Sequence, residues 1–184
     1  TTCADDNDFD FSGDFSVGAW IKPDDLTGTG HMIITKATGS DGIFQLYTET
    51  NALKFQLLTT AAAEYLGANT SIVDVDDGRW HFVLGVAKGD TVQLYLDGRL
   101  VASDTSTSGS RDTDTTGALV VGQRSDLPAG YYFDGLIDEP FAYSKVLTES
   151  EIKALYEFGA RRYKLTNPTL NTTVLQNLSG ATQD

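Results

Sequence analysis

The sequence predicts an all-β protein, a sandwich of two antiparallel sheets with one short helix near its end. Three observations predict this fold class. Short apolar segments with two-residue alternation recur along most of the 184 residues, and such segments at regular spacing are typical of sandwiches and barrels. Clusters of Gly, Asp, Asn, Ser and Thr separate them as turns. A hydrophobic content of 40% at this length is enough for one domain with a complete core.

The strongest strand signal lies in the stretch 80–105. It contains three apolar runs separated by Gly89-Asp90 and Asp97-Gly98, and the second pair suits the φ > 0 positions of a type I′ hairpin turn. We therefore expect an antiparallel meander with one core face. Side-chain alternation predicts that this face carries Phe82, Leu84, Val86, Val92, Leu94 and Leu96, and that the opposite face carries Gln93 and Tyr95.

The remaining strands follow from the same alternation, taken in chain order. A short first strand is expected near 9–12, in an Asp-rich segment, and a second strand closes at Pro23. The strands predicted after the first are 15–23, 31–37, 42–48, 52–58, 71–75, 118–123 and 131–144, with less regular segments at 24–30, 59–70, 103–117 and 124–130. Pro140 in the last strand indicates an edge position or a bulge.

One helix is predicted at about 148–158. Thr148 and Glu151 have the spacing of a capping box, in which each side chain bonds the other residue's backbone N–H. The apolar residues that follow fall on one helix face, and Gly159 stands where a helix commonly stops. We therefore predict a domain over 1–159, followed by a linker or docking arm over 160–184.

Composition limits the possible partners. Twenty-six acidic against 13 basic residues give a net charge of -13, which disfavours nucleic acid because phosphate backbones are repelled. No apolar run is long enough for a membrane span. The single cysteine, Cys3, cannot form an internal disulfide. Because the sequence begins at Thr1, without Met or a signal peptide, we expect a processed or excised part of something longer.

Four separated motifs carry a resemblance to a known family. They are GDFSVGAWIKP (13–23), IITK (33–36), GRWHFVLGVAKGDTVQLYLDGRLVAS (78–103) and GLIDEPFAYSKVLTESEIKALYEFG (135–159). Their order and spacing resemble the laminin-G-like, pentraxin-like branch of the concanavalin A-like jelly rolls, over roughly the stretch 9–159. The resemblance implies a jelly roll of two curved sheets, found outside the cell or on a virion surface.

The resemblance also implies a structural calcium ion. In related folds an aspartate of the last long strand is a ligand, with help from the N-terminal segment, and Asp138 matches that position. Calcium takes about six to eight oxygen ligands, and the expected further ligands are Asp6, Asp8 and Asp10. The alternative is a solvated acidic N-terminus, with Asp138 bonding backbone amides.

A sugar site is the second expectation. Sugar sites pair a flat aromatic ring with amides and carboxylates that bond hydroxyl groups. Tyr131 and Tyr132 are adjacent, so one of them should face outward if they lie in a strand. Tyr65 and Asn69 mark a second candidate edge. The candidate ligand-binding residues are therefore Tyr131, Tyr132, Arg124, Asp126, Tyr65 and Asn69. The alternative is that both adjacent tyrosines are rim packing.

The sequence argues against catalysis. Glucanase relatives carry their acidic side chains in an alternating Glu-x-Asp-x-x-Glu strand, and the residues around Asp138 do not match it. The two histidines, His31 and His81, lie in no nucleophile or metal pattern and are predicted to be structural. Trp20 and Trp80 each lie inside a strand motif and are predicted to be core residues.

These observations predict a non-catalytic binding or adhesion module that recognises a glycan or surface ligand, within a larger extracellular or virion-surface protein. The alternative is a structural or assembly protein of a virion, such as a capsid-decoration or fibre domain, that docks to a neighbour or to copies of itself through 160–184. The tyrosine pair favours the first reading, and the Asn/Thr/Leu-rich tail favours the second.

Overall fold

A computed structural model describes residues 2–3, 11, 13–26, 30–38, 41–49, 52–58, 65–70, 75–105, 117–124 and 131–164. Within these ranges the chain forms β1 (Thr2–Cys3), β2 (Phe15–Pro23), β3 (His31–Thr38), β4 (Asp41–Glu49), β5 (Ala52–Leu58), β6 (Tyr65–Thr70), β7 (His81–Lys88), β8 (Thr91–Leu96), β9 (Arg99–Thr105), β10 (Ala118–Val121), β11 (Gly135–Tyr143) and α1 (Glu149–Lys164). The helix α1 lacks the length and apolar character that crossing a membrane requires.

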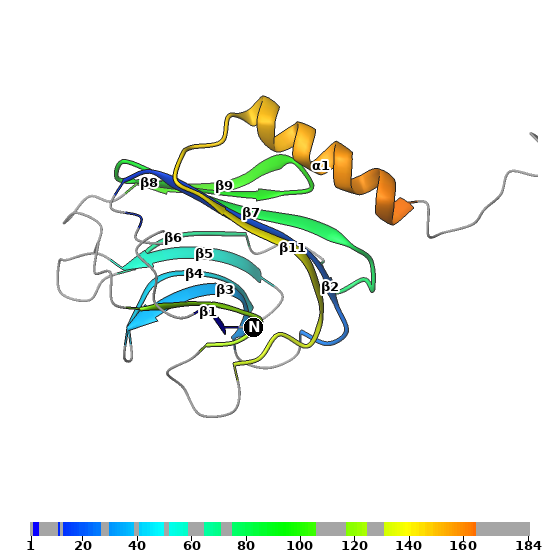
Figure 1. The fold of residues 1–184 in the computed structure, drawn as a ribbon, viewed down its shortest axis with the longest axis horizontal. Helices are drawn as coiled ribbons and strands as arrows, with labels where there is room; N and C mark the ends of the chain where they lie inside the picture. The colour runs from blue at the N-terminus through cyan, green and yellow to red at the C-terminus, as the bar shows by residue number, and fades with distance from the viewer. Residues whose placement is uncertain are drawn as a thin grey trace, which may run out of the picture.

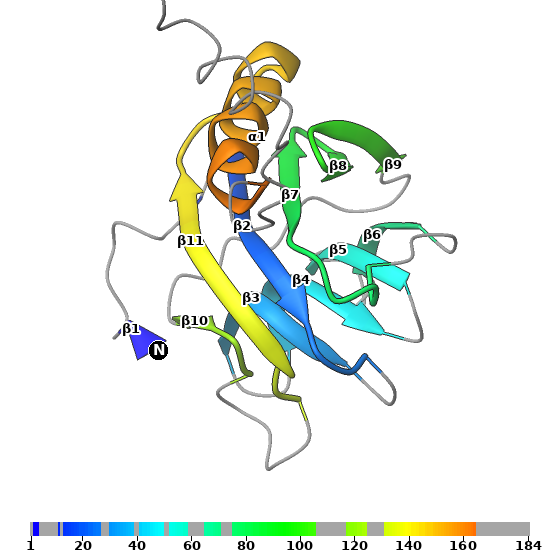
Figure 2. The same ribbon diagram turned by 90° about the vertical axis from the view of Figure 1, so that its right-hand side faces the viewer.

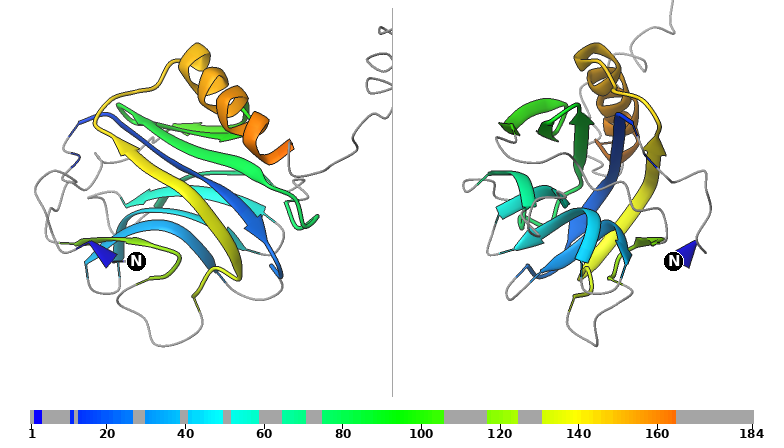
Figure 3. Two further views of the ribbon diagram at one scale, coloured as in Figure 1. Left: turned by 45° about the vertical axis from the view of Figure 1, so that its right-hand side comes forward. Right: turned by 90° about the vertical axis from the view of Figure 1, so that its left-hand side faces the viewer.

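The strands form two antiparallel sheets packed face to face, as predicted (Figure 1). The six-stranded sheet has the order β1-β10-β3-β4-β5-β6, and the five-stranded sheet has the order β11-β2-β7-β8-β9. The helix lies across the outer side of the five-stranded sheet, and Figure 2 shows β11, β2 and β7 running side by side beneath it. Two further views show the same three layers (Figure 3).

The inter-sheet core fills the space between the two sheets. It consists of Phe15, Val17, Ala19, Ile21, Ile33, Ile34, Phe44, Leu46, Leu53, Phe55, Leu57, Ala68, Val83, Ala87, Val92 and Leu94. Its packing is close enough that Gly85 of β7 admits no side chain, because a Cβ there would collide with the ring of Phe55. The packing of this core holds the two sheets together.

The five-stranded sheet is buried on both faces, which corrects the predicted meander. In the observed register, Val83 pairs with Leu96 and Ala87 pairs with Val92, so the apolar residues of β8 share a face with the odd-numbered residues of β7. The even-numbered residues of β7 face α1 instead. The resulting helix-side core contains Trp20, Phe82, Leu84, Val86, Tyr95, Leu147, Ile152 and Ala160. Tyr95, predicted to lie opposite the core face, is 3% exposed because α1 covers it.

The short-range signals were reliable. Asp97 and Gly98 have φ values of 49° and 75°, as a type I′ turn requires. Near Pro140 the pairing of β11 with β2 shifts register, and Glu139 has φ 49°. Both the predicted bulge and the predicted edge position are confirmed, since β11 is the outermost strand of its sheet.

The strand at 65–70 was not predicted, and two predicted strands lie largely outside the described residues. The segment 65–70, predicted to be irregular, is β6, and its small and polar residues pair along β5 while Ala68 is buried. Small residues conceal a strand because they show little alternation. In the predicted strand 71–75 only residue 75 is described, and it is not in a strand. Of the predicted first strand, 9–12, only Phe11 is described, and its ring stacks on Phe15 outside any strand.

The helix begins as predicted and ends six residues later. Glu151 accepts from the Thr148 amide (2.8 Å), and Thr148 Oγ1 accepts from the Glu151 amide (3.3 Å), which completes the capping box. Gly159 does not stop the helix, contrary to the prediction. It is buried within α1, and a Cβ at this position would collide with the Trp20 indole. The glycine lets the helix approach the sheet closely, and α1 continues to Lys164.

Candidate ligand-binding site

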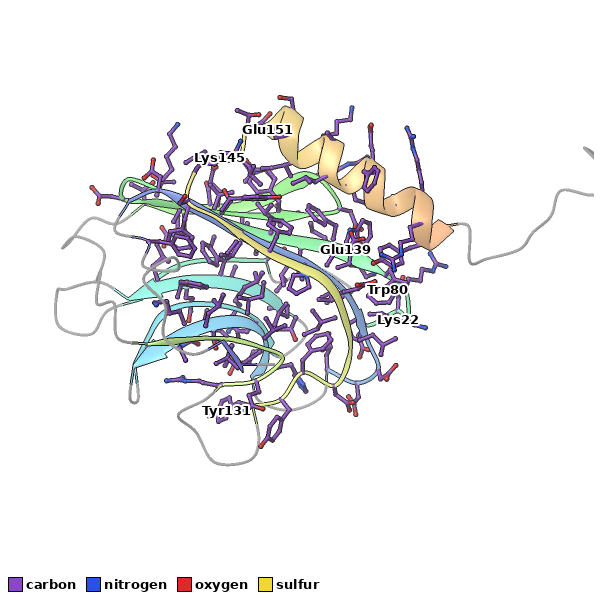
Figure 4. The ribbon with its side chains drawn as sticks, viewed as in Figure 1. Lys22, Trp80, Tyr131, Glu139, Lys145 and Glu151 are labelled. Atoms are coloured by element: carbon purple, nitrogen blue, oxygen red, sulfur yellow. The ribbon has the colours of Figure 1, made fainter. Side chains whose placement is uncertain are left out.

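The two adjacent tyrosines point in different directions. Tyr131 is half-buried and packs against Gly30, whose Cβ, if present, would lie 2.6 Å from Tyr131 Cδ1. Gly30 has φ 63°, a conformation that favours glycine. Tyr132 is 52% exposed. One of the pair therefore faces outward, although both precede β11, and Figure 4 shows Tyr131 on that connection.

The two groups of predicted ligand-binding residues do not meet. Arg124 follows β10 and is partly exposed, whereas Asn69 is exposed on β6. Three strands separate β10 from β6, which corresponds to roughly 19 Å at the usual strand spacing. Asp126 lies outside the described residues, as does the side chain of Tyr65. The described members therefore form two separate surfaces.

The predicted calcium ligand Asp138 is held by protein donors. Its Oδ2 accepts a hydrogen bond from Tyr163 Oη (2.8 Å), and its Oδ1 accepts one from the Glu139 amide (2.8 Å). Arg162 Nη2 lies 3.5 Å from the same carboxylate. Within the described ranges no three His, Cys, Asp or Glu side chains form a group that could hold a metal ion. The other expected ligands, Asp6, Asp8 and Asp10, lie outside those ranges.

A pocket of about 780 Å³ opens where the C-terminal half of α1 meets the end of the five-stranded sheet, and we call it the helix pocket. It is lined by Trp20, Lys22, Asp77, Gly78, Arg79, Trp80, His81, Asp97, Tyr156, Ala160 and Tyr163. Figure 4 shows Trp80 and Lys22 at this end of the molecule, below the last turns of α1. The pocket therefore combines large aromatic rings with both signs of charge.

Four aromatic rings build one wall of the helix pocket. Trp20 of β2 stacks with Tyr156 at a centroid separation of 5.7 Å and contacts Tyr163 at 4.7 Å. The two tyrosines are seven residues apart, so two helical turns place them on one face of α1. Trp80, just before β7, stacks on Tyr163 at 4.5 Å and 27°. Trp20 is a buried core residue, as predicted, whereas Trp80 is only partly buried and lines the pocket.

The last turn of α1 is anchored to the bulge of β11. Tyr163 donates to Asp138, as described above, and Arg162 Nη1 pairs with Glu139 Oε1 at 2.7 Å. Burial and the hydrogen bond to Asp138 raise the pKa of Tyr163, so its hydroxyl stays a donor over the physiological pH range. These contacts fix the ring against which Trp80 rests.

His81 is held between two carboxylates at the polar side of the pocket. Its Nε2 lies 3.0 Å from Asp77 Oδ1, and its Nδ1 lies 3.0 Å from Asp97 Oδ2. Carboxylates only accept, so both contacts are satisfied by an imidazolium that donates twice. Burial opposes this charge, but the hydrogen bonds to Asp97 and Asp77 outweigh it and raise the pKa of His81 above 6.5. Asp97 Oδ1 also accepts from the Phe82 amide (2.9 Å), so Asp97 links the His81 ring to the backbone of β7. This linkage favours the structural role predicted for His81.

Sequence reasoning missed the helix pocket because its residues come from four distant segments. Tyr163 had been placed in a linker or arm and Trp80 in the core. One signal was present, since Ile152, Tyr156, Gly159 and Tyr163 are spaced at helical intervals of four, three and four residues. If Gly159 is read as a small residue within this stripe, the pattern predicts a longer helix that carries both tyrosines.

Two curved antiparallel sheets, with one helix on an outer face, place the chain in the class of lectin-like β-sandwiches. Its residues 1–153 match the sequence model of the Concanavalin A-like lectin/glucanases superfamily, in the laminin G-like branch. The chain belongs to this family, as the resemblance of the four motifs implied. No curated protein sequence matches it.

Solved structures with the same fold include binding domains of bacterial toxins. The botulinum neurotoxin serotype G binding domain has a TM-score of 0.61 at 14% identity, covering 82% of this chain and 37% of its own. The binding domain of Paraclostridial Mosquitocidal Protein 1 has a TM-score of 0.59 at 15% identity, and the match covers 80% of this chain and 38% of that one. The binding domain of botulinum neurotoxin DC in complex with SialylT has a TM-score of 0.58 at 16% identity, and the match covers 79% of this chain and 35% of that one. The chain spans little more than a third of these proteins, and the likeness concerns the fold.

Proposed function

We propose that this domain is a non-catalytic, extracellular carbohydrate-binding module and that the helix pocket is its sugar site. The observation that carries the proposal is the composition of the pocket, in which the partly buried Trp80 ring stands beside charged groups. Sugar sites need this combination, because a pyranose has an apolar face and a ring of hydroxyl groups. The fold shared with toxin binding domains, one of them solved with SialylT, is consistent with it.

The polar side of the pocket retains capacity for hydroxyl groups. Asp77 and Asp97 are 30% and 34% exposed at their side chains. Each carboxylate offers about four lone-pair sites, and on each residue His81 and one backbone amide occupy one site apiece. The remaining sites can accept from sugar hydroxyls. Because His81 and the backbone already hold both carboxylates, little side-chain entropy is lost when a sugar binds.

A pair of aromatic variants tests the location. We expect Trp80→Ala to weaken the binding of glycan-array hits by about 30-fold, the loss typical of a central aromatic contact. Tyr132→Ala is the matched control, because it removes an exposed ring at the site predicted from the sequence. We expect no change from it. Melting temperatures would establish that both variants are folded.

Two other outcomes of this experiment would contradict the proposal. If Tyr132→Ala abolishes binding and Trp80→Ala does not, the sugar site lies at the connection preceding β11, and the helix pocket is excluded. If the wild-type domain binds no glycan on the array, the carbohydrate function is wrong.

Calcium remains a separate proposal. Asp138 fits it poorly as placed, because Tyr163 and Arg162 already hold its carboxylate, and the other expected ligands lie outside the described residues. A melting temperature that rises in Ca²⁺, with a rise that Asp138→Asn removes, would support the ion, since a ligand of the native state stabilises it. Equal melting in Ca²⁺ and in chelator would reject it.

The assembly alternative also remains a proposal. Residues 160–164 belong to α1 and to the wall of the helix pocket, so a docking arm would begin after Lys164, in residues that lie outside the described ranges. Deleting 165–184 should then abolish an oligomer seen by light scattering. An unchanged particle mass would reject docking through this segment.

A further inference from the structure

We infer that the helix pocket selects an acidic sugar, with Lys22 pairing with the carboxylate or sulfate group of the ligand. This inference rests on the proposed sugar site and names the substrate class. It starts from the charges at the pocket. The protein carries a net charge of -13, so an unpaired cation in a binding pocket is unexpected.

The carboxylates at and beside the pocket already have cationic partners. Asp77 and Asp97 flank His81, and Arg79 Nε lies 3.5 Å from Asp77. Arg162 forms ion pairs with Asp138 and Glu139, the two acidic residues of the β11 bulge. The acidic groups of this region are therefore largely neutralised by protein, and they do not draw a cation into the pocket.

Lys22 differs from these groups. It is partly buried on β2 and lines the pocket, yet within the described part of the chain its ammonium has no ion pair or hydrogen bond. Elsewhere in those ranges, Lys54 and Lys145 each pair with a glutamate at 2.6 Å. A partly buried lysine can lay its stem along apolar surface while its ammonium stays available to an anionic partner. The pocket leaves that partner to be supplied by a ligand.

Register places the Lys22 side chain beside the Trp80 ring. Trp20 pairs with Phe82 and Ile21 with His81 across β2 and β7, so the next residues along the two chains are Lys22 and Trp80. Directly opposed residues have Cβ atoms about 5 Å apart and share a face of the sheet. Figure 4 shows both side chains at the same end of the molecule. A sugar ring lying against Trp80 therefore has its substituents within reach of Lys22.

The type of cation indicates a broad class of anion. Lysine is a compact point charge with three donors, whereas arginine favours planar, bidentate partners. Arg79, the arginine of the lining, has an 81% exposed side chain and lies near Asp77. Lys22 is thus suited both to the carboxylate of a sialic or uronic acid and to a sulfate ester, and the common requirement is a negative charge on the sugar.

Three matched sugars test this inference by calorimetry on the full chain. The probes are lactose, sialylated lactose and sulfated lactose. We expect at least one acidic form to bind about tenfold more tightly than lactose, the size of one hydrogen-bonded charge contact. Lys22→Gln should reduce the affinity for that acidic sugar to about the affinity for lactose. Comparison of the two acidic forms separates carboxylate from sulfate recognition.

The control and the contrary outcomes distinguish this inference from the proposed function. Lys88→Gln removes an exposed lysine at the other end of β7 and should leave every affinity unchanged, which accounts for the general effect of one charge. Equal affinities of the wild type for lactose and both acidic sugars, or an acidic preference that survives Lys22→Gln, would overturn the inference and leave the sugar site standing. Absence of binding to all three sugars, in a protein whose array shows no glycan hit, would overturn both.

Discussion

The two cores of this domain differ in composition and in closure. The inter-sheet core consists mainly of aliphatic and phenylalanine side chains, each exposed by 2% or less. The helix-side core is built around the rings of Trp20, Phe82 and Tyr95 and is bordered by partly exposed rings such as Trp80 and Tyr163. One core is closed and the other opens into the helix pocket. We infer that stability depends mainly on the first and ligand binding on the second.

Geometry explains this difference. Two sheets packed about 10 Å apart meet over their whole area, and alternating side chains fill the space between them. A helix is a cylinder about 10 Å across, so α1 covers only a strip of the five-stranded sheet. Large rings fill the edges of that strip incompletely. A pocket at the end of the helix is the result.

The largest expected effect separates the two cores. Phe55→Ala removes a fully buried ring from the inter-sheet core and should lower the free energy of unfolding by about 3–5 kcal/mol. Where the variant is still folded, its sugar affinity should equal that of the wild type. Denaturant titration and calorimetry measure the two quantities. A loss of affinity in the folded variant would mean that the two cores are coupled.

A smaller loss is expected where α1 approaches the sheet. Gly159→Ala forces a methyl group into the Trp20 indole and should destabilise the domain by about 1–3 kcal/mol. Alanine otherwise favours a helix by about 1 kcal/mol, so a stabilised variant would show that the contact yields easily. Phe158→Ala is the neighbouring control. Its side chain is 76% exposed, and we expect a change within about 0.5 kcal/mol.

A still smaller effect is expected from the anchor of the last helical turn. Tyr163→Phe keeps the ring that stacks on Trp80 and removes the hydrogen bond to Asp138. We expect a loss of about 1 kcal/mol in unfolding free energy and only a few-fold loss of sugar affinity. Tyr143→Phe, at a partly exposed position on β11, is the control and should change neither. A Tyr163→Phe variant as stable as the wild type would contradict the proposed anchoring.

The smallest effect concerns pH. Because the hydrogen bonds to Asp97 and Asp77 raise the pKa of His81 in the folded state, the stabilisation from its charged form is complete below the unfolded pKa of about 6.5. It is lost as the pH rises through the raised folded pKa. Unfolding free energies measured from about pH 6 to about pH 9 should decline more steeply for the wild type than for His81→Gln. Parallel curves would contradict this assignment.

Local signals made much of the fold predictable. The Asp97-Gly98 turn, the Thr148 capping box and the effect of Pro140 each depend on a few adjacent residues, and all three were found as predicted. The faces of β7 and β8 could not be assigned this way. Alternation shows which residues share a face, but on a strand buried on both sides it cannot show which face meets which layer.

The candidate site was less predictable than the fold for the same reason. Trp80 and Lys22 are neighbours only through the pairing of β7 with β2, and Tyr163 joins them only because Gly159 allows the helix to continue against Trp20. Each of these contacts joins segments far apart in the sequence. A local pattern identifies a turn or a cap, but it does not identify a pocket whose walls meet only in the folded chain.

The bulge in β11 has a consequence for how copies of this domain behave when they are crowded. The outermost strand of a sheet presents backbone donors and acceptors that could pair with a strand of another molecule. In β11 that row is interrupted, because Pro140 has no N–H and the register shifts between Asp138 and Phe141. The β11 edge of the five-stranded sheet is thus a poor template for intermolecular strand addition. Strand pairing along β11 is therefore disfavoured between copies of this domain that are held close together.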